Sequence, residues 1–128
     1  MELLEILGWG KEQVEDIRYV AYHYLKEGKY DTSIKLFEAL TSLDPNNEYD
    51  LQSLGALHLE KHESLKALDY FELALKINKT HYPTLLNKAK ALLDLGYKNQ
   101  AIDLIKRLML AKDSSVRKKA EALFLSHS

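Results

Sequence analysis

The chain of 128 residues has no cysteine, only five glycines and two prolines, and almost no excess of charge. Without thiols it has no disulfide scaffold, no thiolate zinc site and no cysteine nucleophile. A formal net charge of −1 gives no strong attraction to nucleic acid or to an anionic membrane. No apolar run approaches the roughly 20 residues of a transmembrane helix, and the acidic start at Glu2 and Glu5 is unlike a signal peptide. We therefore expect a soluble, cytoplasmic protein that binds neither nucleic acid nor membrane.

The composition that remains favours one helical domain. A hydrophobic fraction of 46% is sufficient for a packed core, and the length suits a single domain. So few turn-forming residues leave little room for the many turns of an all-β fold. Long helices with short connections are therefore expected.

The strongest pattern in the chain is an internal repeat of 34 residues. Three series of small or aromatic positions recur at this step, and they run through three units without an insertion. The series are Ala21, Gly55, Ala89; Ser33, Ala67, Ala101; and Phe37, Phe71, Ile105. We therefore divide the chain into an N-terminal arm (1–13), three repeats (14–47, 48–81 and 82–113) and a C-terminal segment (114–128).

Each repeat is expected to fold as two helices. In the first repeat Ile17, Val20, Ala21 and Tyr24 follow helical spacing and define one buried face. Glycines such as Gly28 and Gly96 favour helix ends because they readily adopt positive φ. The Asp44–Pro45 pair is expected to end the second helix of the first repeat. Asn78 is expected to end the corresponding helix of the second repeat in the left-handed conformation. The recurring small residues predict close helix crossings, and such hairpins must stack because one alone cannot bury both faces.

Two segments lie outside the repeats. Residues 114–124 are expected to form a capping helix, with Asp113 as its N-cap and the basic run Arg117–Lys119 on its wet face. The N-terminal arm carries Leu4, Leu7 and Trp9, which are a candidate interface because large apolar patches seldom remain exposed on monomers. The arm is therefore also a candidate for homodimer formation.

These residues resemble the tetratricopeptide repeat family over about four-fifths of the chain. The resemblance rests on the small and aromatic positions of the helix hairpins. The matching positions are Val20, Ala21, Tyr24, Phe37 and Pro45; Leu54, Gly55, Ala67, Phe71 and Ala74; and Ala89, Gly96 and Ala101. Departures include Ser33 in place of an alanine, and Lys79 and Asp113 where proline is usual. The resemblance implies an all-α fold, a superhelix of three tandem hairpins with a C-terminal capping helix.

A narrower resemblance points to the tetratricopeptide chaperones of bacterial type III secretion. It rests on short strings in the first two repeats: Gly28-x-Tyr30, Leu36–Leu40, Leu43–Asp44–Pro45 and Leu54–Gly55–Ala56. That family keeps hydrophobic translocator or needle subunits soluble before export, which would connect the chain to bacterial virulence. The implied partners are such a secreted subunit and, as a further candidate, a co-chaperone.

In this family geometry the first helix of each repeat lines a concave groove. The inward positions are rich in apolar and aromatic residues, which suit an extended apolar peptide. They are Arg18, Tyr19, Tyr22, Leu25, Tyr49, Gln52, Ala56, Leu59, Leu86, Asn87, Lys90 and Leu93. The alternative interpretation is that these residues pack against the arm or against one another.

Other functions are less well supported by the residues. A carboxylate clamp, which in some tetratricopeptide adaptors binds heat-shock protein C-termini, needs basic and amide side chains at five positions. The chain has Arg18, Tyr22, Ser53, Pro83 and Asn87 at these positions. Only Arg18 has a suitable charge. The His58 and His62 pair has helical spacing for a metal site, but Leu59 stands where the metalloprotease motif needs glutamate. We therefore expect no catalytic residues, no cofactor and no metal.

The sequence thus predicts a non-enzymatic binding protein. The first hypothesis is a cytoplasmic type III secretion chaperone that holds a hydrophobic secreted subunit in its groove. The alternative is a scaffold or adaptor that recognises a peptide within a multiprotein assembly.

Overall fold

The computed structural model describes residues 2–127, with the side chains of Glu2 and Leu4 outside this description. Within these residues the regular elements are all α-helices. They are α1 (Glu2–Leu7), α2 (Lys11–Lys26), α3 (Tyr30–Leu43), α4 (Glu48–Glu60), α5 (Ser64–Ile77), α6 (Tyr82–Asp94), α7 (Lys98–Leu108) and α8 (Ser114–His127). The expected all-α fold is confirmed.

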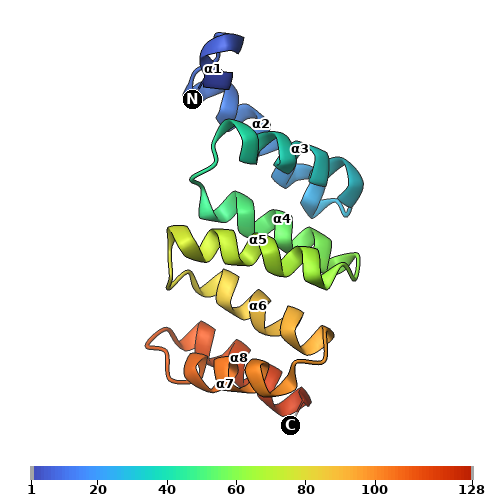
Figure 1. Ribbon diagram of the computed structural model, residues 1–128, viewed down its shortest axis with the longest axis vertical. Coiled ribbons are helices and arrows are strands. Elements are labelled where there is room, and N and C mark those ends of the chain that lie inside the picture. The colour runs from blue at the N-terminus through green and yellow to red at the C-terminus, as the bar shows by residue number, and fades with distance from the viewer. Residues whose placement is uncertain (1, 128) are drawn as a thin grey trace.

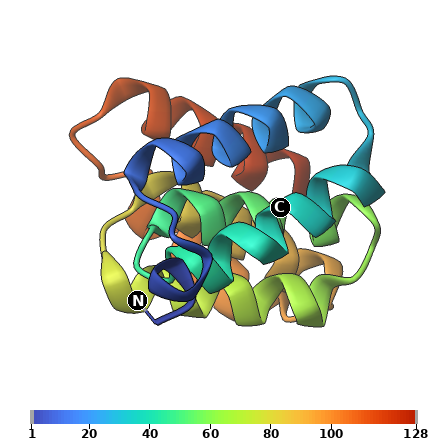
Figure 2. The same ribbon diagram turned by 90° about the horizontal axis from the view of Figure 1, so that it is seen from above.

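The helices pair into hairpins that stack along the long axis of the molecule, with the two ends of the chain at opposite ends (Figure 1). α2 packs on α3, α4 on α5 and α6 on α7, and α3 and α5 each pack on the first helix of the next hairpin. Viewed along the stack, α2 and α8 lie toward one edge and α5 toward the opposite edge (Figure 2). The fold is therefore the expected superhelix of helix hairpins.

The small residues of the repeat lie where the two helices of each hairpin cross. Ala21 and Ala89 are fully buried, and Gly55 is buried against the ring of Phe71. An added Cβ on Gly55 would lie 2.5 Å from Cε1 of this ring, so the crossing of α4 and α5 requires glycine. Ser33, in place of the usual alanine, donates its hydroxyl to the Ala21 carbonyl at 2.9 Å. Each crossing thus has a glycine or alanine at its first helix, which lets the second helix approach closely.

A residue with positive φ lies two residues after the end of the first helix of every hairpin. Gly28 and Gly96 have φ of 77° and 82°, as the sequence predicts, and His62 occupies the same place in the second hairpin with φ of 60°. The prediction for Asn78 is wrong, because this residue is extended with φ of −141°. α5 instead ends without a left-handed residue, and the Asn78 side chain accepts hydrogen bonds from Thr80.

A buried ion-pair cluster joins the first hairpin to the second. Arg18 on α2 donates through Nε and Nη2 to the fully buried carboxylate of Asp50 on α4, at 2.7–3.1 Å. The same guanidinium also contacts Asp44 at 2.8 Å and Glu15. These hydrogen bonds raise the pKa of Arg18 above its usual value, whereas burial raises the pKa of Asp50 and Arg18 opposes that rise. The cluster fixes α2 relative to α4.

α8 closes the stack by packing on α7 and α6. The expected N-cap is confirmed, since Asp113 Oδ1 accepts hydrogen bonds from the amides of Ser115 and Val116. Val20, expected on the buried face of α2, is 40% exposed and lies at the edge of that face. Among the described residues, no helix has both the length and the apolar character needed to cross a membrane.

Replacing Gly55 with alanine is expected to destabilise the protein. The new methyl group overlaps the Phe71 ring, and overpacking costs about 1–3 kcal/mol, which outweighs the gain of about 1 kcal/mol in helix propensity. Urea unfolding followed by circular dichroism measures the change. Gly55→Ala combined with Phe71→Leu should recover part of the loss, and a stability equal to that of the wild type would contradict the close crossing.

Replacing Arg18 with leucine is expected to cost about 3 kcal/mol, because the Asp50 carboxylate would remain buried without its partner. The double variant Arg18→Leu, Asp50→Leu should recover most of this loss, since no charge then remains buried. Lys61→Ala is the control, because it removes an exposed ion pair with Asp31 and should change little. If Arg18→Leu unfolds at the same urea concentration as this control, the cluster does not couple the hairpins.

Candidate functional site

A central hollow of about 230 Å³ lies where α2, α4 and α6 face one another. Its lining includes Leu25 from α2, Ala56 and Leu59 from α4, and Asn87 and Lys90 from α6. All five belong to the set that the sequence predicts for the groove. Tyr30 at the start of α3 and Glu60 at the end of α4 also line the hollow, and the repeat pattern did not single them out. The fold thus brings residues from all three repeats together at one site.

A second hollow follows α2 and contains Arg18, Tyr19 and Tyr22. Tyr19 is 76% exposed and is free to contact a ligand. Tyr22 is half-buried, packs edge-on against Phe37 at 5.0 Å between ring centroids, and accepts a hydrogen bond from Ser53 at 3.0 Å. Burial raises the pKa of the Tyr22 hydroxyl, which keeps it protonated. Arg18 is held by carboxylates of the chain, and the exposed Glu15, His23 and Lys26 also line this hollow, so this end of the groove combines tyrosine surface with polar and charged side chains.

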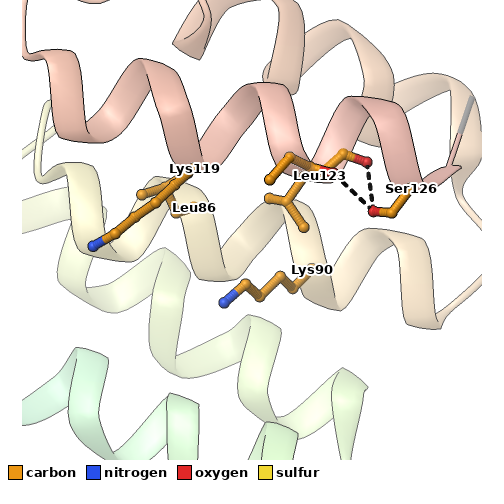
Figure 3. Close-up of a pocket in the computed structure, with 6 residues that line it drawn as sticks. Leu86, Lys90, Lys119, Leu123 and Ser126 are labelled. Atoms are coloured by element: carbon orange, nitrogen blue, oxygen red, sulfur yellow. Dashed lines mark hydrogen bonds between the residues drawn. The ribbon is translucent and has the colours of Figure 1, made fainter.

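Two further hollows lie between α6 and α8. The first, of about 280 Å³, is lined by Leu86 and Lys90 of α6 and by Lys119, Ala122, Leu123 and Ser126 of α8 (Figure 3). The second, of about 390 Å³, includes Tyr49, His81, Pro83, Leu86 and Lys119. Lys90 is shared by the first of these and the central hollow, and Leu86 and Lys119 are shared by the two hollows at α8. The hollows therefore adjoin one another across α4, α6 and α8.

His81 forms a buried wall of the hollow near Tyr49. Its Nδ1 lies 2.6 Å from the Thr84 hydroxyl, and its ring meets the Tyr49 ring edge-on at 4.6 Å. Burial lowers the pKa of His81, so the imidazole is neutral at neutral pH. This histidine therefore contributes shape and no charge.

The remaining predicted site residues lie apart from these hollows. Gln52 and Leu93 are half-buried, and Leu93 packs against the core formed by α6, α7 and α8. In the arm, Leu7 and Trp9 are partly exposed at 44% and 39%, and the Leu4 side chain lies outside the described part of the chain. α1 contacts α3, so the described arm does not cover the groove.

The two histidines considered for a metal site do not share a helix face. α4 ends at Glu60, and His62 follows in the turn with positive φ. His58 is buried, stacks on Tyr70 at 5.4 Å and bonds Glu63 through Nδ1 at 3.0 Å, which lowers the pKa of Glu63. Among the described residues, no group of three or more metal-ligating side chains occurs. His58 is a packing residue of the second hairpin.

The basic run on α8 is divided among different environments, which the sequence did not indicate. Arg117 donates to the carbonyls of Ala111 and Lys112 at 2.9 and 2.7 Å and closes the turn before α8. Lys118 is exposed, whereas Lys119 lines both hollows beside α6. If the 34-residue repeat continued into α8, the positions equivalent to Asn87 and Lys90 would be Glu121 and Phe124, and these two residues would line the groove. α8 begins two residues before that step predicts, and this shift changes the face it presents.

Similar folds occur in solved tetratricopeptide structures. The translocator chaperone SycD of Yersinia enterocolitica superimposes with a TM-score of 0.84 at 17% identity, covering 96% of both chains. SycD in complex with a peptide of the translocator YopD superimposes with a TM-score of 0.79 at 20% identity, and the match covers 93% of this chain and 98% of the other. The first tetratricopeptide domain of Spaghetti (RPAP3), bound to an HSP90 peptide, superimposes with a TM-score of 0.75 at 18% identity, and the match covers 89% of this chain and 95% of that domain's chain. At these identities the likeness establishes the fold.

No curated protein shows a significant sequence match to the chain. A family model does match: residues 26–108, well over half of the chain, fit the family described as anaphase-promoting complex, cyclosome, subunit 3. The matched segment runs from the last residue of α2 to the end of α7, so it contains α3 and the two hairpins α4–α5 and α6–α7. The chain therefore belongs to this family, which is of the tetratricopeptide-repeat type.

Proposed function

We propose that this protein binds an extended apolar peptide in the groove formed by α2, α4, α6 and α8. The observation that carries the proposal is the central hollow, in which Leu25 of the first repeat meets Ala56 and Leu59 of the second. Concave apolar sites with a few polar groups are the usual ligand sites of proteins. Asn87 and Lys90 at the margin of the same hollow can supply hydrogen bonds to a peptide backbone.

Within this class we propose a chaperone of type III secretion, which would hold a hydrophobic secreted subunit in the cytoplasm. The short strings of the first two repeats support this choice, and so does the fold shared with SycD, which has a peptide of the translocator YopD as its ligand. The exposed arm residues Leu7 and Trp9 are proposed as a second contact surface, for a partner or for a second copy.

The alternative is an adaptor for heat-shock protein C-termini, as in the Spaghetti domain with its HSP90 peptide. The side chains at the clamp positions do not favour it. Arg18 is engaged by Asp50, Asp44 and Glu15, and the Ser53 hydroxyl is bonded to Tyr22. A clamp must present unpaired donors to a carboxylate, so the first proposal accounts better for this groove.

Ala56→Arg is expected to reduce partner recovery by about tenfold or more, because its long charged side chain would fill the central hollow. The full chain is used as bait in the native host, and co-eluting proteins are identified and quantified. Ala39→Arg is the matched control, since Ala39 is exposed on α3 away from the groove lining. Circular dichroism checks that both variants keep their helices.

Co-expression then separates the two proposals. A chaperone should keep its co-eluting partner soluble when that partner aggregates alone, whereas an adaptor should bind a partner that is already soluble. Equal partner recovery by Ala56→Arg and Ala39→Arg would refute the groove as the binding site.

A further inference from the structure

The hollow between α6 and α8 differs in charge from the rest of the groove. Its two cationic residues, Lys90 and Lys119, stand on either helix, and its described lining contains no carboxylate. In the other hollows a carboxylate accompanies the cations: Glu60 lies with Lys90 in the central hollow, and Asp113 lies with Lys119 near Tyr49. Glu15 lies with Arg18 and Lys26 in the hollow along α2. This part of the groove is therefore positively charged in a chain whose net charge is −1.

Both ammonium groups remain open to a ligand. Both lysines are exposed, and within the described part of the chain neither has an acidic side chain at ion-pair distance. In the view of Figure 3 the two side chains point to the same side, with Leu123 above Lys90. Among the described ion pairs, Lys29 and Lys61 have carboxylate partners, whereas the exposed Lys76 and Lys106 do not. Lys90 and Lys119 therefore stand apart through the apolar hollow that both line.

The wall beside these lysines is apolar. Leu86 is buried and Leu123 is half-buried, and Ala122 completes the surface on α8. The Ser126 hydroxyl donates to the carbonyls of Ala122 and Leu123 at 2.9 and 3.1 Å, so it adds no free donor. A ligand that fits this hollow must offer an aliphatic group to the leucines and negative charge to the lysines.

We propose that the hollow between α6 and α8 binds an acidic, apolar segment of the partner peptide. An aliphatic side chain lies against Leu86 and Leu123, and flanking Asp or Glu carboxylates pair with Lys90 and Lys119. The proposal rests on the proposed peptide-binding function and adds a sequence preference to it. Since Lys90 also lines the central hollow, the same peptide can continue toward α4.

The preference should be moderate and sensitive to salt. Ion pairs at an exposed site contribute little each, and ions screen them. Charge complementarity also increases the rate of association more than the final affinity. Together the two lysines are expected to favour an acidic over a neutral peptide by about fivefold at low salt.

Fluorescence polarisation with two labelled synthetic peptides tests this preference. Both are extended and carry leucines at the same positions, but one has Asp on each side of its last leucine and the other has Asn. The Asp peptide should bind about fivefold more tightly to the full chain, and high salt or Lys90→Gln combined with Lys119→Gln should remove this difference. Lys76→Gln combined with Lys106→Gln, on the outer helices α5 and α7, is the control with the same charge change and should keep it.

The outcomes separate the preference from the groove itself. Equal binding of the Asp and Asn peptides to the wild type, with both lost in Ala56→Arg, would refute the acidic preference and leave the groove intact. Absence of binding by either peptide would count against both proposals. Sedimentation of the wild type and of the lysine variant completes the test. If the wild type self-associates and the variant does not, the acidic, apolar segment 2–7 of another copy occupies the hollow. That result would overturn the proposal that a partner peptide is the occupant.

Discussion

The rest of the structure depends on how closely the two helices of each hairpin approach. At Gly55 the Phe71 ring occupies the space that a Cβ would need, and Ala21 and Ala89 are fully buried at the matching crossings. Side-chain size at a crossing sets the distance between helix axes. Because this contact recurs in every repeat, successive first helices come side by side, and the groove is a consequence of their alignment.

Polar groups within the stack are largely committed to holding this alignment. Arg18 bonds to Asp50 across the first two hairpins, Ser33 bonds to the Ala21 carbonyl, and Ser53 bonds to Tyr22. A buried charge that keeps its partner costs far less than one that loses it. The chemistry left at the groove surface therefore comes from apolar side chains, tyrosines, lysines and a few acidic and amide side chains such as Glu60 and Asn87.

The groove consequently has two different ends. Near α2 the exposed Tyr19, with Tyr22 packed on Phe37, lies among Glu15, His23 and Lys26, so aromatic surface is mixed with charges of both signs. Near α8 the surface combines Leu86 and Leu123 with Lys90 and Lys119.

The sequence by itself determined the repeat, the helix ends at Gly28, Gly96 and Pro45, the Asp113 cap and five residues of the central hollow. These features depend on local conformation or on a fixed helical step, and both can be recognised in a single chain. Tertiary structure decided the positive φ of His62, the pairing of Arg18 with Asp50 and the choice of Lys119 over Lys118 at the groove. The physical reason is that contacts between helices depend on their crossing geometry and on the starting residue of each helix. A shift of two residues along α8 rotates the face it presents by about 200°, slightly more than half a turn.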